Sequence, residues 1–128
     1  MGTLRTVRVY DDNTKEDGKR ILIDRLWPRG VTKEEAAIDE WAKEVTPSNE
    51  LRKAYHDGDI DAETFRKKYR KELDDNEDAP AFVSKVEGFL SVGNVTLVTS
   101  VKNVSDSQVP VLLEYLKEKL DRKSLKEE

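Results

Sequence analysis

Apolar residues along the chain form two kinds of pattern, one typical of strands and one typical of helices. Alternation and short apolar runs, the strand patterns, mark three segments. In segment 4–10, strict alternation places Val7 and Val9 on one face of an extended strand. Segment 20–27 holds the continuous apolar run Ile21, Leu22 and Ile23, and segment 95–101 reads VTLVTSV, and both are typical of strands that are covered on both faces. The pattern therefore predicts three strands, one near the start of the chain and two that are fully buried.

The longer period, at helical spacing, occupies the stretches between and after these strands. Thr32 and Glu35 form a capping box, S/T-x-x-E, and Val31 and Ala36 have the spacing of a hydrophobic staple. We therefore expect a helix to begin at Thr32. Its apolar stripe would be Ile38, Trp41 and Val45, and four more helices are predicted from Pro47 or Asn49 to about 56, and over about 61–73, 79–92 and 108–121.

Strands at both ends that enclose a helical middle predict an α/β fold rather than a helix bundle. The long helical connection between segments 20–27 and 95–101 allows those two strands to be parallel. Segment 4–10 runs either antiparallel to its neighbour or through an irregular crossover, because the connection over 11–19 is short. We expect one small domain over 1–121, with a short mixed or parallel sheet of about three strands and about five helices. A charged tail would follow over 122–128.

Composition narrows the class of protein. The chain has 128 residues, of which 39% are charged, but 23 basic and 27 acidic side chains leave a net charge of only −4. Disorder needs low hydrophobicity together with high net charge, so we expect a folded domain with a highly charged surface. The chain has no apolar run that could span a membrane and no signal-peptide pattern, so we expect a cytoplasmic protein without membrane contact. The absence of cysteine excludes disulfides and thiolate chemistry.

Common metal and phosphate motifs fail on inspection. Asp57-x-Asp59-x-Asp61 starts like a calcium loop, but Ala62 stands where the turn glycine is needed and Lys68 where the bidentate glutamate is needed. The glycine patterns of phosphate-binding loops and the nucleophile elbow of hydrolases are also absent. We therefore expect no metal site and no cofactor.

The segment Asp24–Gly30, with the sequence DRLWPRG, lies at the carboxyl end of a predicted buried strand. Ligands of open α/β sheets bind outside such strand ends. If the backbone stays extended, Arg25, Trp27 and Arg29 share one side, where two guanidiniums beside an indole can present forks to a carboxylate or phosphate. Gly30 would let the backbone approach the ligand closely.

Charge supports this segment, although a structural alternative competes with it. Residues 19–33 carry five basic side chains against one acidic side chain, a local net charge of +4 in an acidic protein. In the alternative, Trp27 belongs to the core, Arg25 pairs with a buried carboxylate, and Pro-Arg-Gly is only a turn. Both interpretations remain open from the sequence.

Other candidate residues come from two further places. His56 is the single histidine, and imidazole is the best general acid–base group near neutral pH, so it is the tentative catalytic residue. Arg52 lies four residues earlier, on the same helical face. The alternative is a solvent-facing or capping histidine at a helix end. A parallel sheet would also bring Lys102 and Asn103, which follow the last strand, to the edge that holds DRLWPRG.

Three stretches of the chain resemble the YeaO-like family of uncharacterised bacterial proteins, a domain-of-unknown-function family. They read ILIDRLWPRGVTKEEAAIDEW, TPSNELRKAYHD and FRKKYRKEL, and the resemblance extends from about Val7 to Leu120. The resemblance implies a compact α/β domain and brings no established activity, substrate or cofactor. The family pattern falls on Asp24, Arg25, Trp27, Pro28, Arg29, Gly30, Trp41, Pro47, Ser48, Leu51, Arg52, His56, Phe65, Tyr69 and Leu73.

The chain departs from the family pattern in two places. Ala54 stands where the family has a second bulky aromatic residue before its histidine. After the last strand the family resembles Lys-Asp followed by a His-Asn pair, whereas this chain has the sequence KNVSDS over 102–107. A catalytic role that needs the second histidine therefore does not carry over to this chain.

These observations favour a small anionic ligand, bearing phosphate or carboxylate, as the partner of the Arg/Trp patch, with enzymatic activity left open. The ligand-binding candidates are Arg25, Trp27, Arg29, Gly30, Arg52, Lys102 and Asn103. The alternative is a non-catalytic regulatory domain that docks an acidic partner protein through the same patch. Nucleic acid is the weakest candidate: basic residues over 66–71 could contact it, but the acidic segments would oppose binding.

Overall fold

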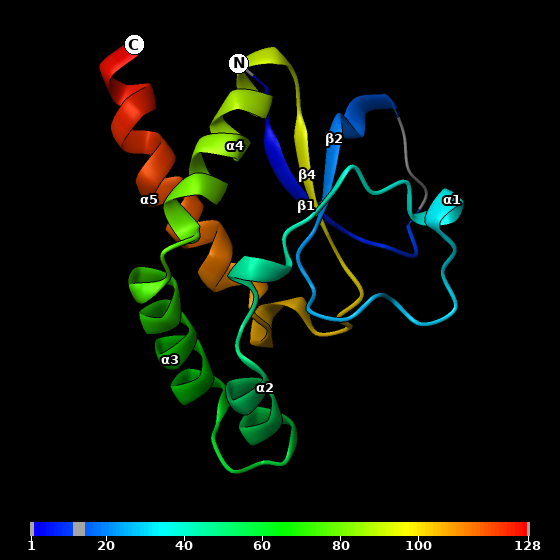
Figure 1. The fold of residues 1–128 in the computed structure, drawn as a ribbon, viewed down its shortest axis with the longest axis vertical. Coiled ribbons are helices and arrows are strands. Elements are labelled where there is room, and N and C mark those ends of the chain that lie inside the picture. Colours follow the sequence, from blue (N-terminus) through cyan, green and yellow to red (C-terminus); the bar gives the residue numbers. More distant parts are fainter. Residues whose placement is uncertain (1, 12–14, 128) are drawn as a thin grey trace. The chain divides into compact units, whose positions relative to one another are not determined.

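The computed structural model describes residues 2–11 and 15–127 (Figure 1). Contacts between Cα atoms divide the chain into two compact units, each built from two stretches of sequence. Unit 1 comprises Met1–Thr46 and Ser84–Lys102, and unit 2 comprises Pro47–Val83 and Asn103–Glu128. The domain over 1–121 and the tail over 122–128 stay predictions.

Unit 1 contains a four-stranded sheet in which each strand is parallel to its neighbours. The predicted α/β class is confirmed, with one more strand than expected. Figure 1 shows β4 between β1 and β2. The strands are β1 (Leu4–Arg8), β2 (Lys19–Leu22), β3 (Glu40–Trp41) and β4 (Val95–Thr99), in the order β1-β4-β2-β3.

The two central strands are buried, as their continuous apolar runs predicted. All five residues of β4 are buried, and in β2 only Lys19 is exposed. Ile21 pairs with Leu97, and neither side chain has any exposed surface. Burial of an aliphatic side chain of this size contributes about 1.5–3 kcal/mol to the stability of the fold. This pair therefore stabilises the centre of the sheet.

The direction of the first strand, which the sequence left open, follows from the place of β4. Strands β1 and β2 both pair with β4 in parallel, so they are parallel to each other and separated by one strand. The connection over 9–18 therefore has to return the length of a strand, about 17 Å. Ten extended residues can span about 33 Å, so this connection is long enough without a full helix.

The predicted helix after DRLWPRG begins as expected but ends after one turn. The Glu35 amide donates to Thr32 Oγ1 (3.1 Å) and the Thr32 amide donates to Glu35 Oε1 (2.9 Å), which confirms the capping box. Val31 packs against the cluster that contains Ala36, as the staple spacing predicted. Helix α1 covers only Lys33–Ala36, because Ala37 adopts the left-handed conformation with φ 51°.

The prediction that this helix continues to Val45 is wrong. The Asp39 and Ala42 amides donate to the carbonyls of Arg20 (2.8 Å) and Leu22 (2.9 Å), which makes β3 the edge of the sheet. A 3-10 turn, η2 (Lys43–Val45), follows. Carbonyls that β2 offers along its edge therefore take the amides that a longer helix would have used.

Unit 2 is helical, and the remaining helix predictions are confirmed. Helix α2 is capped by Ser48 Oγ, which accepts from the Leu51 amide (3.2 Å), and α3 is capped by Asp61, which accepts from the Thr64 amide (2.8 Å). The last helix continues past residue 121, where the sequence predicted its end. The elements are α2 (Asn49–His56), α3 (Ala62–Asp75), the 3-10 turn η3 (Val104–Asp106) and α5 (Val109–Glu127), whereas α4 (Ala79–Val92) begins in unit 2 and ends in unit 1.

Among the described residues, no helix is long and apolar enough to cross a membrane.

Candidate functional site

The strand ends of unit 1 form the edge at which the sequence predicted a site. Because all the strands are parallel, their carboxyl ends lie at the same edge of the sheet. We call this region the carboxyl edge and define it by the last residue of β1 and the segments that follow β1, β2 and β4, namely residues 8–11, 23–30 and 100–102. The DRLWPRG segment and Lys102 both belong to it.

Asp24 ties two of these segments together. Its side chain is buried, with a relative exposure of 7% for the residue. The carboxylate accepts hydrogen bonds from Thr99 Oγ1 (2.6 Å), from the Ser100 amide (2.7 Å) and from Ser100 Oγ (2.8 Å). This role was missed from the sequence, although an acidic residue after one buried strand and Thr-Ser after another would have signalled it.

The two arginines of DRLWPRG differ in their surroundings. Arg25 is half-buried and donates from Nη1 to Thr46 Oγ1 (3.1 Å), while Arg29 is exposed. Gly30 follows in a turn with φ 77°, and nothing lies within 4 Å of the position that a Cβ would occupy. The positive φ, rather than close contact, is therefore what favours glycine at this position.

Trp27 takes part in packing, as the structural alternative proposed. It contacts the buried cluster of Val9, Ala36 and Val98, and its indole N–H donates to the Val31 carbonyl (2.7 Å). One side of Trp27 also lines an open pocket. The described lining residues of that pocket are Trp27, Lys33, Ile38, Asp39, Glu40 and Trp41, and do not include Arg25 or Arg29.

The basic run over 19–33 does not form one patch. Lys19 and Arg20 lie at the opposite end of β2 from the carboxyl edge. Arg20 is buried and its Nη1 lies 2.6 Å from Asp17 Oδ2, and the other oxygen of that carboxylate pairs with Arg5. The basic residues of this run that follow a strand at the carboxyl edge are thus Arg25 and Arg29.

Two more strand ends contribute basic side chains to this edge, in addition to Arg25 and Arg29. Arg8, the last residue of β1, donates from Nε to the Val101 carbonyl (3.1 Å), and its guanidinium lies 5.0 Å from the centre of the Tyr10 ring. Lys102, two residues beyond Ser100, is exposed. Basic side chains therefore lie at the carboxyl ends of three adjacent strands, in the order β1, β4 and β2.

The other predicted site residues belong to unit 2. His56 is exposed at the last position of α2, and Arg52 donates to Asn49 Oδ1 (3.2 Å). Asn103 donates to Asp106 Oδ2 (2.9 Å) just before η3. The structure thus assigns Arg25, Trp27, Arg29, Gly30 and Lys102 to one unit and Arg52, His56 and Asn103 to the other.

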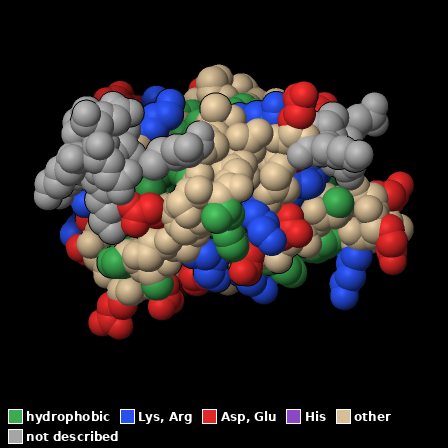
Figure 2. Space-filling model, turned by 90° about the horizontal axis from the view of Figure 1, so that it is seen from above, with side chains coloured by type: hydrophobic (Ala, Val, Ile, Leu, Met, Phe, Trp, Pro, Cys, Tyr) green, Lys and Arg blue, Asp and Glu red, His purple; other side chains and the backbone are tan. Residues whose placement is uncertain are grey.

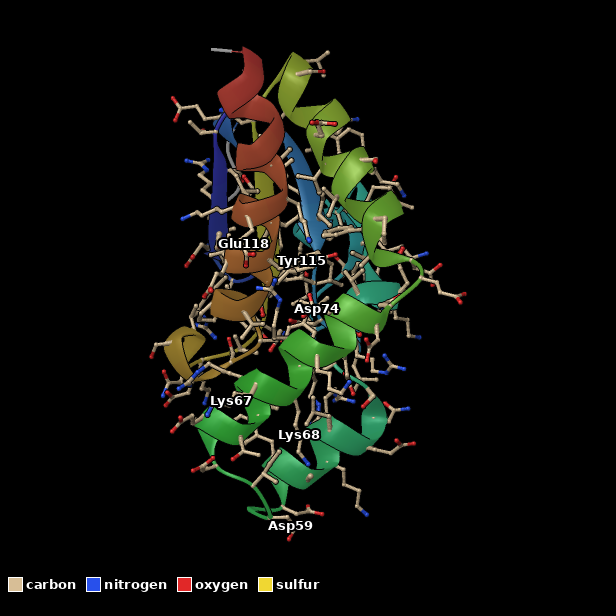
Figure 3. All side chains as sticks on the ribbon, turned by 90° about the vertical axis from the view of Figure 1, so that its left-hand side faces the viewer. Asp59, Lys67, Lys68, Asp74, Tyr115 and Glu118 are labelled. Atoms are coloured by element: carbon tan, nitrogen blue, oxygen red, sulfur yellow. The ribbon has the colours of Figure 1, made fainter. Side chains whose placement is uncertain are left out.

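Four basic residues of α3, the helix considered for nucleic-acid contact, have acidic partners within unit 2. Figure 3 labels Lys67, Lys68 and Asp74 along this helix, and Tyr115 and Glu118 on α5. Arg70 donates to Asp74 (3.0 Å) and to Glu118, and the hydrogen bond that it donates to Glu118 raises the pKa of Arg70. The helix also forms the ion pairs Lys67–Glu63 (3.1 Å), Lys71–Asp75 (3.1 Å) and Arg66–Asp106 (3.9 Å).

The face drawn in Figure 2 shows blue and red side chains interspersed over the described residues, with small green areas between them. Mixed charge of this kind produces no long-range field of one sign on that face. Within residues 2–11 and 15–127, no group of three acidic, histidine or cysteine side chains is arranged to hold a metal ion.

Comparison with known proteins places the chain in a family. The model of the DUF488-N3i family, described as the inactive DUF488-N3 subclade, matches residues 3–128. The chain belongs to the DUF488-N3i family. The match to DUF488-N3i includes the DRLWPRG segment, the whole sheet and the helices of unit 2, so it extends over both units.

Relatives of this DUF488-N3i member include the uncharacterized protein YeaO of Escherichia coli strain K12. The two are 44% identical over 110 residues, which is 86% of this chain and 93% of the relative, and this confirms the resemblance to the YeaO-like family. The uncharacterized proteins Rv3073c of Mycobacterium tuberculosis H37Rv and Mb3100c of Mycobacterium bovis are each 35% identical over 113 residues, which is 88% of this chain and 92% of the relative. No solved structure gives a significant match.

Proposed function

We propose that this DUF488-N3i protein binds a small anionic ligand, bearing phosphate or carboxylate, at the carboxyl edge of its sheet. The observation that carries the proposal is the set of basic residues at three adjacent strand ends: Arg8 on β1, Lys102 after β4, and Arg25 and Arg29 after β2. Parallel sheets bind ligands at this edge, where loops from separate strands can converge on one molecule.

Each residue would act according to its surroundings. Exposed Arg29 and Lys102 would reach the anion, and Arg25, braced by Thr46, would present its guanidinium with less loss of side-chain entropy. Buried Asp24 would hold the segments after β2 and β4 in register. Arg52, His56 and Asn103 belong to unit 2, so the proposal does not depend on them.

Binding without turnover is the form of activity that we favour. The family that matches the chain is described as an inactive subclade. The chain also lacks a second histidine, and its single His56 is exposed at a helix end. A lone solvated imidazole is a weak candidate for general acid–base catalysis.

A second candidate is an acidic partner protein that docks on the same edge. Leu26 and Tyr10 are large apolar residues with relative exposures of 62% and 53%, and both lie in carboxyl-edge segments. Exposed aromatic and apolar side chains beside arginines are typical of protein interfaces.

A thermal-shift experiment tests the proposal with inorganic phosphate, pyrophosphate and citrate, and with an acidic peptide as a separate arm. A ligand at a hundredfold excess over its Kd adds about 2.7 kcal/mol, which raises the melting temperature of a domain this size by several degrees. We expect the shift to be lost in Arg29→Ala and Arg25→Ala and kept in Arg66→Ala, a matched substitution on α3. A response to the acidic peptide alone would favour the partner protein. A small-anion shift that survives both edge substitutions contradicts the proposal.

A further inference from the structure

An open pocket in unit 1 has a composition opposite to that of the carboxyl edge. It has a volume of about 260 Å³ and is lined by Trp27, Lys33, Ile38, Asp39, Glu40 and Trp41. Pockets for drug-sized ligands measure roughly 300–1,000 Å³, so this one suits a smaller molecule. Two indoles and an aliphatic side chain form its apolar part, and two carboxylates stand against one ammonium in its charged part.

The two indoles meet in a fixed corner. Their ring centres lie 5.6 Å apart with an angle of 69° between the planes. The Trp27 N–H donates to the Val31 carbonyl and the Trp41 N–H donates to the Asp24 carbonyl, each at 2.7 Å. Because both polar N–H groups are used inside the protein, the indoles offer a ligand mainly their π surfaces. Trp41 remains 38% exposed in this position.

The pocket lining holds two carboxylates and one ammonium, and two further ammoniums, of Lys43 and Lys85, lie beside Trp41 and Glu40. Asp39 uses Oδ2 to accept from the Arg20 amide (2.8 Å), and this contact orients the side chain while leaving the net charge in place. Glu40 lies 3.6 Å from Lys85, and both side chains are about two-fifths exposed. Such a solvated pair contributes little, so a ligand cation can share or displace it at small cost.

The protein itself supplies an example of the contact. The Lys43 ammonium lies 5.1 Å from the centre of the Trp41 ring, within the range of a cation–π interaction. Lys43 is not among the described lining residues of the pocket. The indole of Trp41 therefore already contacts one cation, from a residue outside the described lining of the pocket.

We propose that this pocket binds a small organic cation with methyl or alkyl groups on nitrogen, such as a quaternary ammonium. Methyl groups would contact the two indoles and Ile38, where the positive charge spread over them gains from the π surfaces. Asp39 and Glu40 would neutralise the charge. A bare metal ion would gain nothing from the indoles, and an anion would meet two carboxylates.

Intrinsic fluorescence tests this proposal directly, because the chain has only two tryptophans and both line the pocket. The probe is choline, and the control ligand is 3,3-dimethylbutan-1-ol, which has the same shape without the charge. We expect a saturable change with choline and binding about tenfold weaker with the neutral alcohol. Equal responses to the two ligands, or a change that does not saturate with choline, would overturn the proposal.

Charge-removing variants locate the site. Glu40→Gln and Asp39→Asn should each weaken choline binding about three- to tenfold, whereas Glu34→Gln, an exposed position in α1 outside the pocket lining, should leave it unchanged. Since Asp39 also accepts the Arg20 amide, circular dichroism checks that its variant is folded, and Glu40→Gln decides the matter if it is not. An affinity of Glu40→Gln equal to that of Glu34→Gln would contradict the assignment.

Discussion

The carboxylate of Asp24 is the group at the carboxyl edge whose removal should destabilise the protein most. It is buried and accepts three hydrogen bonds, one from Thr99 and two from Ser100. Asp24→Ala removes both acceptor oxygens and with them all three of these hydrogen bonds, and it leaves the Ser100 amide without this partner. Asp24→Asn keeps the shape and one acceptor oxygen.

The geometry predicts a graded loss of stability. A hydrogen bond to a charged group contributes about 1.5–3 kcal/mol, and burying an unsatisfied amide costs about 1–3 kcal/mol, so we expect Asp24→Ala to lose about 3–5 kcal/mol. In Asp24→Asn the carboxamide oxygen can accept the Ser100 amide, and its NH2 can donate to Thr99 Oγ1. Thr99 Oγ1 already accepts from the Val101 amide at 3.2 Å and has a second lone pair for this bond. The charge assistance is then lost and the Thr99 hydroxyl loses the acceptor of its own hydrogen, so we expect a smaller loss than in Asp24→Ala, about 1–2 kcal/mol.

Urea unfolding followed by far-ultraviolet circular dichroism measures both losses. With a slope of about 1.5 kcal/mol per molar urea, the midpoint should fall by about 2–3 M for Asp24→Ala and by about 1 M for Asp24→Asn. Asp59→Asn is the matched control, because Asp59 is exposed in the loop before α3 (Figure 3). Two variants that unfold with the control would refute the role of Asp24, and equal losses in both would refute the bonding argument.

Three further substitutions test local features. Ala37→Gly should stabilise the protein by about 0.5–1 kcal/mol in thermal unfolding, because φ is 51° there, and a loss would contradict this. Ser48→Ala should cost about 1–2 kcal/mol in urea, since Ser48 Oγ caps α2 and donates to Glu72 (2.6 Å); an unchanged midpoint would refute it. The Thr64 side-chain and backbone hydrogen bonds lower the pKa of Asp61 from 3.8, so its stabilising contribution is complete above pH 3.8 and is lost as pH falls through the lowered value. The stability difference between wild type and Asp61→Asn should therefore shrink below pH 3.8, and a difference that stays constant in acid would contradict this.

The sequence predicted elements well where local signals decide them. The capping box at Thr32 stands at the observed start of α1, and the apolar runs became the buried strands β2 and β4. The sequence-based prediction failed after Ala37, where the helical spacing of apolar residues continues but the helix does not. Edge carbonyls of β2 compete for those amides, and a sequence pattern contains no information on a partner that lies about twenty residues away.

The candidate site shows the same division. Strand polarity and the DRLWPRG segment were enough to predict that Arg25, Arg29 and Lys102 follow parallel strands. The burial of Arg20 beside Asp17 could not be predicted, because a charge count treats every arginine as surface. The neighbours of Trp27 depend on β3, a two-residue strand that has no sequence signature.

Anion binding at the carboxyl edge is most directly tested by a titration of the 15N-labelled protein with inorganic pyrophosphate, followed by two-dimensional NMR. We expect the largest saturable shifts at the Arg29, Gly30 and Lys102 amides, with one shared dissociation constant. Arg29→Ala should raise this dissociation constant about tenfold or more. Shifts scattered over α3, or no saturable shift in residues 23–30 and 100–102, would contradict the proposed function.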